Sequence, residues 1–221
     1  GKTAIARAIH DASPRATCPW VEVNVAALPD ALFESEMFGA ERGAHSQAHT
    51  RIVGKCEAAT GGTLFLDEVG EMSMLAQTKL LTFLQSKSFM RLGGTQSIAA
   101  NVRVIAATNA NLSELVAQKR FREDLFYRLN VVPVHLPPLA ERRADIAVLA
   151  RHFLERLAAE RRVAGPDISP DAMAALQACN WPGNVRQLRN VMERVMILAP
   201  QARLSCIEID MLPPEVLGQE Q

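Results

Sequence analysis

Four short apolar runs constrain the fold of this chain more than any other feature. They occupy residues 20–25 (WVEVNV), 63–68 (TLFLDE), 102–109 (VRVIAATN) and 131–136 (VVPVHL). Runs this apolar are typical of parallel strands that helices cover on both faces. The segments between them carry apolar residues at helical spacing, as in residues 75–87. Strands that alternate with helices predict an α/β domain with a parallel sheet.

The pattern changes to helix alone after the double proline at residues 137 and 138. One predicted helix places Ile146 and Leu149 on the same face as Phe153 and Leu157. Ser169 is a predicted N-cap with a proline at the first helical position. We therefore predict an α/β core over residues 1–138, a helical subdomain over 139–199, and a linker or tail over 200–221.

Composition narrows the class of protein. The 221 residues are 48% hydrophobic, enough for a real core, and 24 basic residues balance 24 acidic ones. This charge balance argues against a nucleic-acid-reading segment, which concentrates positive charge. The four cysteines lack metal-ligand spacing, which favours free thiols in a reducing cytoplasm. No apolar run approaches the roughly 18 to 20 residues of a membrane span.

Polar residues stand near the ends of three predicted strands, at Asn24, at Asp67 with Glu68, and at Asn109. Ligands of open α/β sheets bind at the carboxyl ends of strands, so these residues predict one site. An aspartate after a buried strand can hold the hydration shell of Mg²⁺, and the adjacent glutamate can polarise a water molecule. The alternatives are that Asp67 caps a helix and that Asn109 forms a turn.

The first residues, Gly1, Lys2 and Thr3, match the end of the phosphate-binding pattern G-x-x-x-x-G-K-[ST]. In that loop backbone N–H groups surround phosphates, the lysine neutralises their charge and the threonine hydroxyl reaches Mg²⁺. A helical pattern with Ile5 and Ile9 on one face follows, as the motif requires. Three residues alone are weak evidence, and an ordinary helix start is the alternative.

Five longer blocks resemble the AAA+ domain of bacterial enhancer-binding proteins, the ATPases that activate sigma-54 RNA polymerase. The blocks are ESEMFGAERGAHSQA, GGTLFLDEVGEM, VRVIAATN, RFREDLFYRLNVVPVHLPPLAERRADI and WPGNVRQLRN. They occur in the family's order, and the pattern is most like that of NtrX-type response regulators. The resemblance implies a P-loop AAA+ core with a helical lid, ATP and Mg²⁺ as ligands, and a cytoplasmic ring of six or seven subunits. It also implies that this chain begins within the Walker A loop and lacks the receiver and DNA-binding domains.

The resemblance implies a role for each matching residue near the nucleotide. Gly1, Lys2 and Thr3 would end the Walker A loop, and Asp67 and Glu68 would form Walker B, with Thr3 and Asp67 on Mg²⁺. Asn24 would restrain Glu68 until the γ-phosphate is sensed. Asn109 would be sensor I, and Arg186 would be sensor II on the lid.

Two further matches, Arg122 and Arg128, would be offered to the nucleotide of a neighbouring subunit. Such an arginine can contribute about 10³- to 10⁵-fold in rate. By spacing alone, Arg128 could instead pair with Asp124 four residues earlier, and Arg122 could be a solvated surface residue. Arg186 could simply cap or decorate its helix.

The loop that contacts sigma-54 reads G-A-F-T-G-A in the family. Here residues 43–48 read Gly43, Ala44, His45, Ser46, Gln47 and Ala48. His45 offers less apolar area than phenylalanine, and Gln47 loses the backbone freedom of glycine. We expect a partner loop whose contact with sigma-54 is open. The rival is a regulator that uses the AAA+ fold for oligomerisation or nucleotide sensing. We expect no metal at His45 and His49, because a loop flanked by glycine is not a helix.

Overall fold

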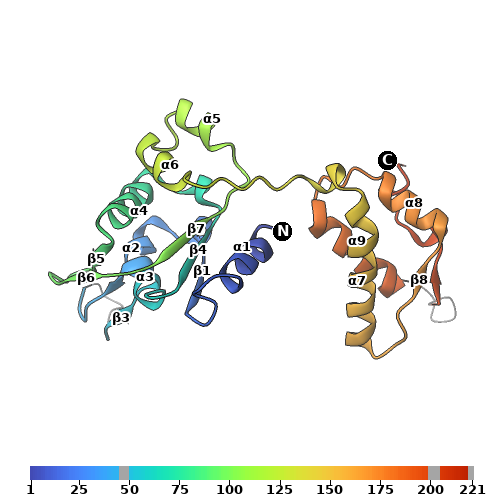
Figure 1. Ribbon diagram of the computed structural model, residues 1–221, viewed down its shortest axis with the longest axis horizontal. Helices are drawn as coiled ribbons and strands as arrows, with labels where there is room; N and C mark the ends of the chain where they lie inside the picture. Colours follow the sequence, from blue (N-terminus) through green and yellow to red (C-terminus); the bar gives the residue numbers. More distant parts are fainter. Residues whose placement is uncertain (45–49, 199–204, 219–221) are drawn as a thin grey trace. The chain divides into compact units, whose positions relative to one another are not determined.

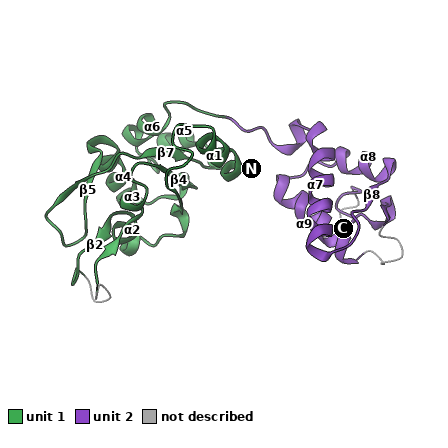
Figure 2. Ribbon diagram, turned by 60° about the horizontal axis from the view of Figure 1, so that its bottom comes forward, with its two compact units in different colours: residues 1–134 green, residues 135–221 purple. Residues whose placement is uncertain are grey.

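The computed structural model describes residues 1–44, 50–198 and 205–218 (Figure 1). The chain forms two compact units, Gly1–Val134 and His135–Gln221 (Figure 2). Of the predicted partner loop, Gly43 and Ala44 are described, whereas residues 45–49, including His45, Ser46, Gln47, Ala48 and His49, lie outside the described residues. Within the described ranges, no helix combines the length and hydropathy that crossing a membrane requires.

The first unit is built on a parallel sheet of three strands in the order β1 (Trp20–Asn24), β4 (Thr63–Asp67) and β7 (Arg103–Ala106). The central strand β4 is the most buried of the three, and its residues Leu64, Phe65 and Leu66 are fully buried. This arrangement confirms the predicted α/β class with a parallel sheet. Three of the four predicted strands form, each within one to three residues of its expected bounds.

Helices cover both faces of this sheet, as Figure 1 shows, with α1 (Lys2–Asp11) on one side and α2 (Asp30–Phe38), α3 (Lys55–Ala58) and α4 (Met74–Ser86) on the other. Leu64 and Leu66 join the main core cluster. Phe65 instead stacks on Trp20 with ring centroids 5.5 Å apart, and Trp20 contacts His10 of α1. Successive side chains of a strand point to opposite faces, so β4 joins both helical layers.

The fourth predicted strand, residues 131–136, is wrong. These residues form no strand, and Val131, Val132 and Val134 are 73%, 80% and 61% exposed. A strand exists only where its backbone N–H and C=O groups pair with a neighbour, and no described strand pairs with this run. Pro133 also removes one donor. The apolar pattern alone therefore mistook an unpaired segment for a strand.

Two antiparallel hairpins extend from the sheet region. The stem hairpin, defined here as β2 (Gly39–Ala40) paired with β3 (Ile52–Val53), carries the predicted partner loop. The second hairpin pairs β5 (Ser88–Met90) with β6 (Ser97–Ala99). Leu92 links the two, because its N–H donates to the carbonyl of Gly39 at 2.9 Å.

Arg91 fixes the two hairpins to each other. Its guanidinium donates to both carboxylate oxygens of Glu57 at 2.9 to 3.1 Å and to Glu41 at 2.8 Å. Hydrogen bonding to Arg91 is the largest cause of the lowered pKa of Glu57. Arg91 is therefore a buried cation with two anionic partners at the base of the partner loop.

The remaining helices of the first unit are short. After β7 come α5 (Leu112–Ala117) and α6 (Glu123–Leu129), and the 3-10 helices η1 (Val25–Ala27) and η2 (Val69–Glu71) follow β1 and β4. As the spacing predicted, Phe121 and Leu125 are buried, with Leu129 packed against the same core. The α6 segment, defined here as α6 with its N-cap Arg122, thus packs on the core through its apolar residues, and its polar side faces outward.

The second unit is helical, as predicted. After η3 (Leu139–Glu141), its main helices are α7 (Ala144–Arg161), α8 (Pro170–Ala178) and α9 (Asn184–Leu198). The hydroxyl of Ser169 accepts the N–H of Ala172, which confirms the predicted N-cap. Trp181 is 1% exposed and belongs to the hydrophobic core of this unit.

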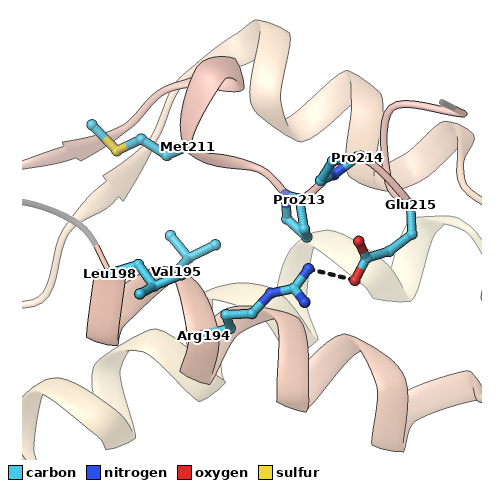
Figure 3. Close-up of a pocket in the computed structure, with 7 residues that line it drawn as sticks. All are labelled: Arg194, Val195, Leu198, Met211, Pro213, Pro214 and Glu215. Carbon is cyan, nitrogen blue, oxygen red and sulfur yellow. Dashed lines mark hydrogen bonds and ion pairs between the residues drawn. The ribbon is translucent and has the colours of Figure 1, made fainter. Parts of the chain in front are cut away.

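The linker predicted from residue 200 is wrong for residues 205–218. There β9 (Cys206–Ile207) pairs with β8 (Asp167–Ile168), and η5 (Ile209–Met211) follows. Ile207, Leu212 and Val216 join the core of the unit because their short apolar pattern finds a partner surface on the helices. Figure 3 shows Met211, Pro213 and Pro214 over α9, beside the ion pair of Arg194 with Glu215.

Candidate nucleotide site

The sheet brings three polar strand ends to one edge. Asn24 is the register partner of Asp67 at the ends of β1 and β4. Beyond β7, the N–H of Ala107 donates to the carbonyl of Leu66 at 2.8 Å, and the carbonyl of Ala107 accepts the N–H of Val69 at 3.0 Å. These bonds hold the segment that ends in Asn109 beside the end of β4.

Glu68 lies at the centre of this edge in a left-handed backbone conformation, with φ +58° and ψ +44°. Such a conformation costs a non-glycine residue on the order of 1 kcal/mol or more and marks functional positions. Its carboxylate accepts Lys2 Nζ at 2.9 Å and Asn109 Nδ2 at 2.7 Å on one oxygen. The other oxygen accepts the backbone N–H of Asn109 at 3.2 Å. Three predicted site residues from distant parts of the chain therefore meet.

Asn24 is close to this group in register but makes a different contact. Its Oδ1 accepts the N–H of Ala26 at 3.1 Å and so caps η1. Among the described contacts, Glu68 is restrained by Lys2 and Asn109, not by Asn24. The role expected for Asn24 therefore has no contact behind it in this state of the chain.

The start of α1 has the features of a phosphate site. Gly1 is the N-cap of this ten-residue helix, and Lys2 and Thr3 lie in its first turn. A helix N-terminus presents unpaired N–H groups and positive potential, which attract phosphate oxygens. Lys2 adds a full charge at the same place.

The side-chain oxygen atoms of Thr3 and Asp67 are suitable ligands for a divalent cation. Among the described residues no three His, Cys, Asp or Glu side chains gather into a metal-binding group. Mg²⁺, however, is commonly held by one or two protein oxygens together with water and substrate phosphates. The Thr3 hydroxyl and the partly buried Asp67 carboxylate are oxygen donors of that kind. Asp67 Oδ1 also accepts the N–H of Glu68 at 3.1 Å, which fixes its carboxylate.

The two arginines of the α6 segment are held differently. Arg122 donates from Nε and Nη2 to the two oxygens of Asp124 at 3.0 and 2.7 Å. Hydrogen bonding within this pair lowers the pKa of Asp124 and raises that of Arg122. Arg128 instead donates to the carbonyl of Leu84 at 2.9 Å. The alternative pairing of Asp124 with Arg128 is therefore wrong, because the fork of Arg122 occupies both carboxylate oxygens.

Arg186, the last predicted site residue, is exposed in the first turn of α9 in the second unit. The predicted set is thus divided between the two units, and the first unit carries the contacts described above. Sequence reasoning missed Gln77, which is fully buried and accepts the backbone N–H of Arg122 at 2.8 Å. The available signal was a lone amide among apolar residues on one face of α4.

Comparison with known proteins finds two family models that match the chain. The model of the family described as sigma-54 interaction domain matches residues 1–135, and that described as AAA+ ATPase lid domain matches residues 140–221. The chain is 52% identical over 198 residues to the regulatory protein AtoC of Escherichia coli (strain K12), covering 90% of this chain and 43% of that protein. It is 50% identical over 212 residues to a Nif-specific regulatory protein of Azospirillum brasilense, covering 96% and 33%.

Among solved structures, NtrX from Brucella abortus in complex with ATP superposes with a TM-score of 0.89 at 45% identity, over 98% of this chain and 49% of that chain. The chain thus spans less than half the length of these relatives. The matched regions follow the two units, with the strand-end site in the first. The chain belongs to the sigma-54 interaction domain family and carries the lid domain of AAA+ ATPases.

Proposed function

We propose that this chain is the ATP-binding and ATP-hydrolysing module of a bacterial transcription regulator. The observation that carries the proposal is the placement of Glu68, whose carboxylate is restrained by Lys2 and Asn109 beside Asp67. The NtrX structure to which the chain is similar is a complex with ATP, and this supports the nature of the ligand.

In this proposal the chain's own residues bind and orient the nucleotide. The N-terminus of α1 and Lys2 hold the phosphates, and Thr3 with Asp67 would hold Mg²⁺, which would supply charge neutralisation at the phosphates. Glu68 orients the attacking water and accepts its proton. Asn109 keeps the carboxylate of Glu68 in place, and Arg186 on the lid contacts the phosphates.

We further propose that ATP binds between subunits of a ring, with Arg122 and Arg128 supplied by the neighbour. Arg122 is the N-cap of α6 and Arg128 lies in its last turn, and Arg122 lines an open hollow of about 450 Å³ with Glu123, Asp124 and Tyr127. Phosphoryl transfer depends mainly on positioning and charge stabilisation, which an arginine from a second subunit supplies. By resemblance to the family, we propose that the protein is cytoplasmic and forms a ring of six or seven subunits.

A conservative substitution tests the hydrolytic role. Glu68→Gln removes the proton acceptor but keeps an oxygen that accepts from Lys2 and Asn109. In the full-length protein we expect ATP binding to persist and ATP turnover to fall about 100-fold or more. Glu71→Gln, an exposed carboxylate three residues later, is the matched control and should leave turnover unchanged. Turnover of Glu68→Gln equal to that of the control would remove Glu68 from its proposed role.

The partner of the loop is a separate proposal. We propose that nucleotide state moves the loop on the stem hairpin and that sigma-54 RNA polymerase is its partner, with a non-remodelling regulator as the alternative. The test compares wild type with a variant carrying Phe-Thr-Gly at residues 45–47, using ADP with a metal fluoride as the phosphate mimic. Binding of sigma-54 by wild type supports the activator. Binding by the variant alone, with equal ATP turnover, favours the alternative.

A further inference from the structure

Arg122 is neutralised by a carboxylate of its own chain. Asp124, two residues later, accepts Nε on one oxygen and Nη2 on the other, which is the fork geometry by which arginine binds carboxylates and phosphates. Thr78 Oγ1 lies 3.4 Å from Nη1. All three guanidinium nitrogens are therefore engaged within the chain, two of them by the carboxylate of Asp124 and the third by the hydroxyl of Thr78.

Arg128 provides the contrast. Its described contact is a single hydrogen bond to a neutral carbonyl, that of Leu84. A carbonyl orients a guanidinium without cancelling its charge. Of the two arginines proposed to reach a neighbour's nucleotide, Arg122 must therefore exchange one anion for another, whereas Arg128 need not.

We propose that Asp124 is a positioning residue that holds Arg122 in the separate subunit and releases it to the neighbour's nucleotide phosphate on assembly. This inference rests on the proposed function, in which Arg122 acts in a neighbouring site. The exchange is feasible because the side chains of Arg122 and Asp124 are 35% and 47% exposed, and exposed pairs are weak. The open hollow beside them leaves room for an incoming group.

The start of α6 survives this exchange. Asp124 Oδ1 also accepts the N–H of Leu125 at 2.8 Å, a contact that does not depend on Arg122. The backbone N–H of Arg122 stays bound to the buried Gln77. The side chain of Arg122 can therefore turn away while its backbone stays in place, and the carboxylate it leaves continues to stabilise the helix N-terminus.

Assembly must break the ion pair between Arg122 and Asp124, so this pair should raise the nucleotide concentration that assembly requires. Asp124→Asn keeps an oxygen for Leu125 and removes the charge that competes with phosphate. From the strength of exposed ion pairs, we expect the nucleotide concentration for half-maximal assembly to fall roughly 2- to 5-fold. Glu123→Gln is the matched control, because it removes the same charge from the adjacent residue of the same hollow.

The experiment follows assembly of the full-length protein by sedimentation velocity while ADP with a metal fluoride is titrated. The expected result is a lower midpoint for Asp124→Asn than for Glu123→Gln, and no further shift when Asp124→Asn is added to Arg122→Ala. An equal midpoint in the two single variants would overturn the proposal. So would the same shift in the Arg122→Ala background, because a helix effect alone would persist there.

Arg122→Ala alone separates this proposal from the proposed function. If this variant assembles and hydrolyses ATP like wild type, Arg122 has no role in a shared site. That result would contradict both the action of Arg122 at a neighbour's nucleotide and the holding role of Asp124. If it is impaired while Asp124→Asn matches its control, the shared site stands and only the holding role of Asp124 is overturned. Thermal melting of each variant checks that the fold is retained.

Discussion

Arg91→Met is the substitution whose effect follows most directly from the contacts of the partner-loop stem. The side chain of Arg91 is 8% exposed and donates three hydrogen bonds to Glu57 and one to Glu41. Methionine keeps much of the apolar stem and removes the charge. The two carboxylates then lose the cation that joins the stem hairpin to the second hairpin.

The size of the effect follows from burial. Removing one partner of a fully buried ion pair costs about 3 to 5 kcal/mol. The side chains of Glu57 and Glu41 are 22% and 39% exposed, so water recovers part of that loss. We therefore expect the free energy of unfolding to fall by about 2 to 3 kcal/mol. For a unit of this size, this corresponds to a melting temperature lower by roughly 6 to 10 °C.

The assay is denaturant and thermal unfolding of wild type, Arg91→Met and Arg42→Met, where Arg42 is an exposed arginine between β2 and β3 of the stem hairpin. The pKa of Glu57 is lowered from 4.5 by Arg91, so its contribution is fully present above about pH 4.5. It is lost as the pH falls through the lower pKa of the folded state. The stability gap between wild type and Arg91→Met should therefore narrow on acidification. If Arg42→Met lowers stability at neutral pH as much as Arg91→Met does, the ion pairs of Arg91 do not stabilise the fold as described.

Three further predictions concern single contacts. Gln77→Met should lower the free energy of unfolding by about 2 to 3 kcal/mol, because the carbonyls of Met72 and Arg120 lose their hydrogen-bond donor. The control is Gln118→Met, at an exposed glutamine of the first unit, and equal melting temperatures of the two variants would contradict this prediction. Ser169→Ala should destabilise the second unit by about 1 kcal/mol through loss of the α8 cap, measured by urea unfolding against exposed Ser205→Ala. Asn109→Ala should impair ATP turnover more than Asn24→Ala does, because Asn109 contacts Glu68; the reverse order would restore Asn24 as the holding residue.

The polar strand ends could be predicted because two local patterns agree there. A buried run such as TLFLD fixes a central strand, and the residues just after a parallel strand lie at the ligand edge. The contacts of Glu68 could not be read from the sequence, because they depend on a left-handed backbone at that residue and on Lys2, which lies 66 positions away. The positions of the strands in the sequence indicate which residues meet at one edge of the sheet, but not which hydrogen bonds these residues form.

Two of the predictions were wrong because a local pattern depended on a distant partner, and a third because a nearer residue formed the contact. Residues 131–136 have the composition of a strand but no described neighbour to pair with. Residues 205–218 look like a tail, yet Ile207 and Leu212 find an apolar surface on the helical unit. The spacing of Asp124 and Arg128 suited an intrahelical pair, but Arg122 offers a two-pronged contact that a single i,i+4 bond cannot match. Tertiary partners decided the first two cases, and a contact between residues two positions apart decided the third.

We propose that ATP is hydrolysed at a site that two subunits share. Mixing full-length Glu68→Gln with full-length Arg128→Ala tests it most directly, because each variant alone lacks one half of every site. We expect each variant to be inactive alone and mixtures to recover part of the ATP turnover, from sites that pair an intact Glu68 with an intact Arg128 of the neighbour. No recovery at any ratio, with mixed assemblies verified by sedimentation, would contradict a shared site.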